Sequence, residues 1–382
     1  MPKKSSLHDF LLLSFCFLCI TGIALGGCGG SASASSASGA GSSTTPAVSQ
    51  QAALGVQTLQ GWYSQSSGLY ASPSGWWNAA NAITALANYE RVSGDQSYDS
   101  VLSNTFTAAQ KTHPNFINSY YDDQGWWALA WIDAYDLTKN ASYLSMAETI
   151  FTNIATNGWD TTVCGGGVWW STAKTYKNAI PNELFLAIAA KLANRTTGSA
   201  SAAYLNWAQK EWTWFKASGM INEQNLVNDG LNSTNPSACV NNGKNTWTYN
   251  QGVILGGLVE LSQADQDTTL LPQAEAIANA ALANLVTPNG ILNETTVSGG
   301  DTPQFKGIFM RNLMALYSAL PSASTLQTQY KTFAEANAAS IWTNDQGTNH
   351  EFGGNWQGPF DSADATRQTS ALDALIAADA MQ

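Results

Sequence analysis

The sequence predicts an all-α protein, an (α/α)6 toroid in which six inner helices are surrounded by six outer ones. From residue 48 onward, apolar residues recur at the spacing of a helix, and no strand-like alternation persists. Six stretches are apolar on all sides, so they must be enclosed by protein. Six amphipathic stretches alternate with them, and such self-similarity indicates a repeat architecture. The alternative for the same twelve helices is an open solenoid.

Residues 1–27 are predicted to be a secretory signal peptide. Lys3 and Lys4 precede an apolar run at residues 10–20, which is too short to anchor a chain stably across a bilayer. The sequence Leu-Gly-Gly-Cys at residues 25–28 resembles a bacterial lipobox, which implies cleavage before Cys28 and acylation of its thiol. The alternative is an ordinary signal peptide with an incidental cysteine.

Residues 28–47 are predicted to be the lipidated cysteine and a tether. Gly, Ser and Ala dominate residues 29–47, and such a segment cannot form a packed core. We therefore expect an exported, membrane-anchored lipoprotein at the cell surface or in the periplasm, in contact with the membrane through its lipid only. Residues 48–382 would then form a single helical domain, for which a monomer is the default expectation.

The amphipathic stretches of this domain predict the outer helices, which cover residues 48–63, 98–111, 142–155, 202–217, 271–285 and 326–340. The stretches rich in apolar and small residues predict the inner helices, which cover residues 76–89, 125–137, 178–192, 249–261, 305–320 and 366–378. In a toroid, the segments that lead into the inner helices converge at one end. Five of these segments carry aromatic or amide side chains, so we expect one functional site, built from residues 75–78, 122–127, 165–170, 248–251 and 304–306.

The five cysteines separate according to these boundaries. Cys16 and Cys19 would leave with the signal peptide and Cys28 would carry the lipid, which leaves Cys164 and Cys239 in the domain. Two cysteines in an exported domain are candidates for one disulfide, although their spacing in the sequence cannot show whether they are close.

The composition excludes several classes of function. Only 11% of the residues are charged and the net charge is −11, so the basic stripe that nucleic acid requires is absent. The chain has three histidines, of which His8 is in the leader, so we expect no histidine-built metal site. Its polar residues are mainly Asn, Gln, Ser and Thr, beside 15 Trp, 13 Tyr and 13 Phe. Neutral hydrogen-bonding groups and flat aromatic faces favour an uncharged, hydroxyl-rich ligand such as a sugar.

The adjacent acids Asp122 and Asp123 are the candidate catalytic residues. Glycoside cleavage uses two carboxyl groups, one that protonates the leaving oxygen and one that acts as base or nucleophile. At an irregular start of a helix, neighbouring carboxyl groups could lie about 5 Å apart, which is the separation of a retaining enzyme. Two close carboxyl groups resist double ionisation, and burial beside Trp126 and Trp127 would raise one pKa further. The alternative is that one of the acids merely caps a helix beginning at Gly125.

Residues 120–138, YYDDQGWWALAWIDAYDLT, resemble the signature of glycoside hydrolase family 76, the endo-α-1,6-mannanases. Further segments resemble the same family in order, namely CGGGVWW (164–170), YKNAIPNELFL (176–186), NDGL (228–231), WTYNQGVILGGLVEL (247–261), DTPQFKGIFMRNL (301–313) and FGGNWQGPF (352–360). The resemblance covers nearly the whole predicted domain. It implies an (α/α)6 fold and hydrolysis of α-1,6-mannan with retained configuration, without a cofactor. It also implies that Asp122 is the nucleophile and Asp123 the general acid/base. Fungal relatives are thought to act as transglycosylases, so water need not be the only acceptor.

Eight further residues are candidate substrate contacts, because they lie at the start of an inner helix or in the segment before it: Trp77, Asn78, Trp126, Trp127, Asp229, Tyr249, Gln251 and Lys306. The tryptophans could stack on sugar faces or pack against neighbouring helices. The amides and the tyrosine could hydrogen-bond a sugar or cap a helix. Asp229 could bind a hydroxyl or shape a turn, and Lys306 could bind a hydroxyl or keep a carboxylate ionised. The glycines at 165–167 are predicted to let the backbone approach the site closely.

Two other functions are compatible with parts of the sequence. A surface glycan-binding lipoprotein would need the aromatic residues but has no use for adjacent acids at the site. An (α/α)6 enzyme acting on uronic-acid polymers would need basic residues to hold the substrate carboxylate, and the predicted site offers chiefly Lys306. The expected ligand is therefore an α-mannan polysaccharide or oligosaccharide.

Overall fold

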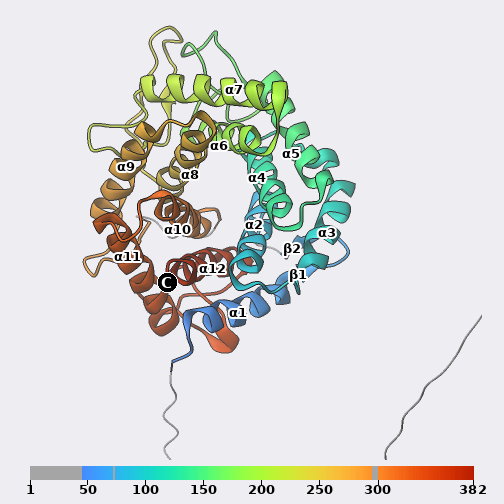
Figure 1. The fold of residues 1–382 in the computed structure, drawn as a ribbon, viewed down its shortest axis with the longest axis vertical. Coiled ribbons are helices and arrows are strands. Elements are labelled where there is room, and N and C mark those ends of the chain that lie inside the picture. The colour runs from blue at the N-terminus through green and yellow to red at the C-terminus, as the bar shows by residue number, and fades with distance from the viewer. Residues whose placement is uncertain (1–44, 72–73, 295–299) are drawn as a thin grey trace, which may run out of the picture. The chain divides into compact units, whose positions relative to one another are not determined.

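Inner and outer helices alternate along the chain and are arranged as two concentric rings (Figure 1). The computed structural model describes residues 45–71, 74–294 and 300–382. The outer helices are α1 (Val48–Leu59), α3 (Asp99–Ala108), α5 (Ala141–Asn153), α7 (Gly198–Ala217), α9 (Leu271–Asn284) and α11 (Thr325–Asn344). The inner helices are α2 (Trp76–Ser93), α4 (Tyr121–Thr138), α6 (Ala179–Arg195), α8 (Thr248–Asp265), α10 (Thr302–Ala319) and α12 (Ala365–Ala380).

The inner ring is closed. Each inner helix packs against the next, from α2 through α4, α6, α8 and α10 to α12, and α12 packs back against α2. Helix α12 also packs against α1, so the first and last helices of the domain lie side by side (Figure 1). Closure confirms the predicted (α/α)6 toroid and excludes the open solenoid.

The two layers differ in burial as their sequences predict. In α6, 14 of the 17 residues are buried, whereas α7 buries 4 of its 20 residues. An inner helix is covered by neighbours on every side, and an outer helix buries only the stripe that faces the inner ring.

Short elements connect the helices. Strands β1 (Tyr63–Ser64) and β2 (Leu69–Tyr70) form one antiparallel pair, and β3 (Leu231–Asn232) and β4 (Val240–Asn241) form another. The remaining short helices are η1 (Gln60–Trp62), η2 (Ala109–Lys111), η3 (Pro114–Phe116), η4 (Ile154–Gly158), η5 (Thr268–Leu270) and η6 (Thr348–His350).

A buried amide in the first turn of three inner helices holds the loop that precedes the helix. Asn182 of α6 binds the backbone N–H and C=O of Val168, at 2.6 and 3.0 Å. Gln251 of α8 binds the same two groups of Val227, at 2.7 and 2.9 Å. Gln368 of α12 accepts from the N–H of Phe352 at 2.8 Å. We call these three side chains the amide clamps. Because a buried backbone group without a partner is costly, the clamps fix the loops at this end of the ring.

The predicted signal peptide, Cys28 and most of the predicted tether lie outside the described residues. Among the helices that the structure describes, none combines the length and the apolar character needed to cross a membrane.

Candidate active site

Asp122 and Asp123 lie in the first turn of α4, which begins at Tyr121. The predicted start at Gly125 was therefore four residues late, and the two acids are helical rather than part of a loop. Neither is the N-cap, since Tyr120 occupies that position and no side chain caps the helix. This geometry contradicts the capping alternative, although both carboxylates still benefit from the positive end of the helix dipole.

The carboxyl group of Asp122 is held through one oxygen only. Its Oδ2 accepts a hydrogen bond from the indole N–H of Trp170 at 2.9 Å. Its Oδ1 is buried and has no hydrogen-bond partner among the described residues. Burial and the neighbouring Asp123 carboxylate raise the pKa of Asp122, and the indole N–H opposes this rise.

Asp123 is held from the turn before α4. Its Oδ2 accepts a hydrogen bond from the side-chain amide of Asn118 at 2.6 Å. Burial raises the pKa of Asp123 and the nearby Asp301 raises it further, whereas the Asn118 amide lowers it. Both carboxyl groups thus titrate above the ordinary value of about 3.9. Because each disfavours the charge of the other, the pair retains one proton over a range in which an isolated aspartate would be ionised.

Four aromatic rings from four inner helices meet beside the acids, and we call them the aromatic quartet. The ring centroids are 5.5 Å apart between Trp77 and Trp126, 6.4 Å between Trp126 and Tyr249, and 3.8 Å between Tyr249 and Phe305. A distance of 6.2 Å between Phe305 and Trp77 closes the set. The structure therefore brings together three of the predicted contacts, Trp77, Trp126 and Tyr249. Trp77 also donates its indole N–H to Asp301 at 2.9 Å.

The surroundings of Tyr249 are acidic. Burial raises its pKa, and the carboxyl groups of Asp229, Asp122, Glu183 and Asp301 raise it further. Asp229, another predicted contact, is half-buried and accepts a hydrogen bond from the hydroxyl of Tyr176 at 2.5 Å. The pair of catalytic candidates thus lies among further carboxyl groups.

Four of the predicted contacts have structural roles instead. Trp127 is 0% exposed and packs against Trp76 and Trp131, because neighbouring residues on a helix point in different directions. Asn78 accepts a hydrogen bond from the backbone N–H of Gly75 at 2.9 Å, so it caps α2. Gln251 is one of the amide clamps and has no exposed surface.

Of the two roles predicted for Lys306, the second is supported, since its ammonium group lowers the pKa values of Glu294 and Asp345, which lie outside the catalytic pair. It is 1% exposed, and its ammonium group donates to the carbonyl of Gly354 at 2.7 Å and lies over the ring of Trp356. Burial lowers its pKa to about 8. All of its bonds are to the loop before α12, so Lys306 stabilises that loop and does not reach the acids.

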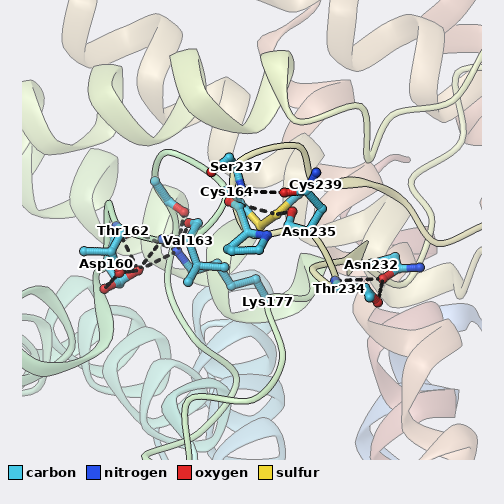
Figure 2. The surroundings of a disulfide bond; sticks show 12 residues. Asp160, Thr162, Val163, Cys164, Lys177, Asn232, Thr234, Asn235, Ser237 and Cys239 are labelled. Carbon is cyan, nitrogen blue, oxygen red and sulfur yellow. Dashed lines mark hydrogen bonds and ion pairs between the residues drawn. A yellow bond between two sulfur atoms is a disulfide. The ribbon is translucent and has the colours of Figure 1, made fainter.

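The loop before α6 is fixed from two directions. The sulfur atoms of Cys164 and Cys239 are bonded, which joins this loop to the segment before α8 (Figure 2). The ammonium group of Lys177 donates to the carbonyls of Asp160, Val163 and Gly166 at 2.6 to 2.7 Å. A Cβ on Gly166 or Gly167 would meet the ring of Trp214, so these two glycines permit close packing against α7. The predicted approach of residues 165–167 to the site stays a prediction.

The contacts predicted from the sequence did not include several residues of the site. Asn118 and Trp170 donate to the two acids, and Asp301 accepts from Trp77. Tyr120 contacts Trp170, Tyr176 donates to Asp229, and the carboxyl group of Glu183 raises the pKa of Tyr249. Trp170 was within a segment singled out for its aromatic residues, and this was a usable signal. Asp301 begins one of the segments that resemble the family, whereas Asn118 carried no signal, because its contact depends on the turn that precedes α4. Among the residues that the structure describes, no group of three or more His, Cys, Asp or Glu side chains is arranged to hold a metal ion.

The chain resembles known proteins over nearly its whole described length. Residues 47–382 match the sequence profile of glycosyl hydrolase family 76. The mannan endo-1,6-alpha-mannosidase DFG5 of Candida albicans is 28% identical over 346 residues, which are 82% of this chain and 74% of that protein. DFG5 of Saccharomyces cerevisiae, which has the same description, is 28% identical over 77% of this chain and 68% of its own length.

The fold is shared with solved structures. An inactive variant of an α-1,6-mannanase from Salegentibacter sp., in complex with α-1,6-mannotetrose, has a TM-score of 0.80 at 23% identity. The match covers 88% of this chain and 100% of that one. In that variant, two consecutive aspartates are replaced by alanine. The profile match over residues 47–382 shows that this chain belongs to glycosyl hydrolase family 76 and is a glycoside hydrolase.

Proposed function

We propose that the protein cleaves α-1,6-mannosidic linkages in mannan by a retaining mechanism, with Asp122 as nucleophile and Asp123 as general acid/base. The observation that carries the proposal is the half-buried Asp122–Asp123 pair, in which both pKa values are raised. Relatives described as mannan endo-1,6-alpha-mannosidases support the substrate. The inactive Salegentibacter variant is altered at two consecutive aspartates, which is the same sequence pattern.

The hydrogen bonds of the two acids suit these roles. Trp170 donates to Oδ2 of Asp122 and so orients the carboxylate that attacks the anomeric carbon. Asn118 holds Oδ2 of Asp123, which leaves its Oδ1 to donate a proton to the leaving glycosidic oxygen. In the second step, Asp123 takes a proton from water as the water attacks C1 and releases Asp122. A sugar hydroxyl in place of this water would give transfer.

In the free protein, the hydrogen bonds of the pair do not favour the distribution of the proton that the first step needs. The amide of Asn118 stabilises the charged form of Asp123, whereas the first step needs a proton on Asp123 and a charge on Asp122. Since the two carboxyl groups share one proton, both distributions are accessible. A bound glycosidic oxygen accepts a hydrogen bond only from protonated Asp123, so substrate favours the reactive distribution.

The charges around the site argue against a substrate with carboxylates. Asp229, Glu183 and Asp301 surround Tyr249 beside the catalytic pair. Lys306, the cation on which a uronic-acid substrate would depend, is bound to Gly354 instead. An acidic site repels an anionic polymer and accepts a neutral one.

Chemical rescue of the two aspartates tests the mechanism. Asp122→Ala should lower cleavage of debranched α-1,6-mannan by several orders of magnitude, because it removes the covalent route. Asp123→Ala should also be severe on mannan, since the leaving alkoxide needs a proton. With an activated leaving group, azide should restore turnover of Asp123→Ala and give a product of retained configuration. Any product that azide gives with Asp122→Ala should be inverted.

The outcomes separate the alternatives. A reversed rescue pattern would exchange the two roles. Folded single variants that cleave mannan at the wild-type rate would overturn the catalytic assignment. Binding of mannan by the wild-type protein without any product would instead favour a glycan-binding protein. Sizing the products of the soluble domain by chromatography distinguishes hydrolysis from transfer, because transfer also yields chains longer than the substrate.

We further propose that the domain is exported and anchored through a lipid on Cys28, with residues 29–47 as its tether. The sequence of residues 1–28 supports this location. Cys28→Ala should move the protein from the membrane fraction to the soluble fraction. Cys19→Ala is the matched control, because it removes a cysteine from the predicted signal peptide and should leave the membrane association unchanged. Persistent membrane association of Cys28→Ala would contradict the anchor.

A further inference from the structure

We propose that Tyr120 and Trp170 form a platform for one sugar ring next to Asp122, and that Trp170 also positions the Asp122 carboxylate. The platform rests on the proposed function, since it would bind a neutral hexopyranose unit of the mannan adjacent to the bond that is cleaved. Neither residue was among the contacts predicted from the sequence.

Both rings are unusually exposed. Tyr120 is 42% exposed and Trp170 is 37% exposed, and the described residues contain only one other large hydrophobic side chain in this class, Val240. The two ring centroids are 5.0 Å apart. Aromatic rings that serve only to fill the core become buried, as Trp127 and Trp131 are. A pair of exposed rings beside two half-buried acids is a candidate binding surface.

The backbone holds the two rings together. The segments that carry them form an isolated antiparallel bridge between Tyr120 and Ser171. The N–H of Tyr121 donates to the carbonyl of Trp170 at 2.9 Å, and the N–H of Trp170 donates to the carbonyl of Tyr176 at 2.8 Å. The platform is thus built before any sugar arrives, which lowers the entropic cost of binding.

The indole of Trp170 connects the platform to the chemistry. Its N–H donates to Asp122 Oδ2 at 2.9 Å, so the plane of the ring is fixed relative to the attacking carboxylate. A sugar that stacks on this ring, through its C–H face, is therefore placed at a defined position relative to Asp122. The same N–H stabilises the ionised form of Asp122, which is the form that attacks.

Three variants separate stacking from positioning. Tyr120→Ala removes platform area but keeps the indole N–H, so KM for α-1,6-linked oligomannosides should rise roughly tenfold with little change in kcat. Trp170→Phe keeps an aromatic face but removes the donor. Its kcat should fall, and the acidic limb of its pH profile should move to higher pH. Trp170→Ala should show both defects.

The control is Tyr135→Ala, because Tyr135 is a half-buried tyrosine near the other end of α4. Its KM should match that of the wild type. Circular dichroism melts of all four variants establish that each is folded. An unchanged KM in Tyr120→Ala overturns the platform, and an unchanged pH profile in Trp170→Phe overturns the positioning role. A wild-type protein that does not cleave mannan overturns the proposed function and this inference together, whereas active wild type with wild-type-like variants overturns this inference alone.

Discussion

At the scale of single residues, the roles of two adjacent tryptophans depend on the directions in which their side chains point. Trp126 belongs to the aromatic quartet, whereas Trp127 packs against Trp76 of α2 and Phe116 of η3. Successive residues on a helix are rotated by about 100°. Of these two adjacent tryptophans, Trp126 therefore belongs to the site and Trp127 to the core.

We expect Trp127→Ala to affect stability and not substrate binding. Removing this fully buried ring leaves a cavity, so the free energy of unfolding should fall by about 3–5 kcal/mol. The folded fraction should retain the wild-type KM for mannan. Denaturant unfolding and steady-state kinetics measure the two effects. Trp126→Ala is the matched comparison, and it should change the kinetics. A raised KM in Trp127→Ala would instead indicate that Trp127 contacts the substrate, as the sequence predicted.

The sequence could predict which residue types form the site better than it could predict their directions. The adjacency of Asp122 and Asp123 is a property of the sequence, and so are the tryptophans that follow them. The roles of Gln251 and Lys306 were not predictable, because each is defined by backbone groups of a loop distant in the sequence. Long polar side chains in an inner helix can bind such backbone groups or a ligand, and no pattern in the sequence distinguishes the two.

At the scale of elements, α4 shows the largest error at the start of an inner helix. Gly125 was interpreted as the helix start, but a Cβ at this position would lie 3.0 Å from the Cβ of Leu184 on α6. The glycine therefore permits close packing of two inner helices. Distinguishing this role from a helix boundary requires the neighbouring helix, which the sequence does not show.

The amide clamps allow a prediction about loops. Asn182→Ala leaves the buried N–H and C=O of Val168 without their partner, which should lower stability by about 1–3 kcal/mol. Its kcat should fall as well, because Trp170 follows in the same loop and holds Asp122. Gln368→Ala is the matched control, since it releases the equivalent loop before α12. It should lose similar stability, as measured by thermal unfolding, but keep its kcat. Equal effects on kcat would contradict a specific link between the α6 clamp and the acids.

The disulfide allows a second prediction at this scale. Cys164 and Cys239 are 75 residues apart in the sequence, so their bond restricts a long loop of the unfolded chain. Replacing both by serine should lower the free energy of unfolding by about 2–4 kcal/mol. A domain that begins at residue 46 should show no free thiol after denaturation and two after reduction. Two free thiols before reduction would reject the bond.

At the scale of the whole molecule, the repeat was the most predictable feature. Periodicity and composition indicated both layers, because an inner helix must be apolar on every side and an outer helix on one. Closure of the ring depends on the contact of α12 with α1 and α2, which no local pattern encodes. The count of six repeats favoured the toroid, and the structure confirms it.

The toroid also buries carboxyl groups outside the site. Their raised pKa values determine how the free energy of unfolding should depend on pH. Burial raises the pKa of Glu211 well above its ordinary value, and it raises that of Glu294 and of Asp345 to about 7. In the unfolded chain, these groups titrate at about 4. Between about pH 4.5 and 7, the unfolded chain therefore binds fewer protons than the folded protein, and stability must fall as pH rises. Lys306, with its pKa lowered to about 8, has the opposite effect only above that pH.

The melting temperature should consequently be higher at pH 5 than at pH 7.5, by several degrees. Differential scanning calorimetry of the soluble domain, at constant ionic strength, measures this dependence. Glu211→Gln provides the control, because Glu211 is 0% exposed and neither of its carboxylate oxygens has a hydrogen-bond partner among the described residues. The amide cannot ionise, so this variant should melt higher than the wild type at pH 7.5 and show a shallower decline. A melting temperature that rises from pH 5 to 7.5 in the wild type would mean that the buried acids are ionised and paired, contrary to their surroundings in the ring.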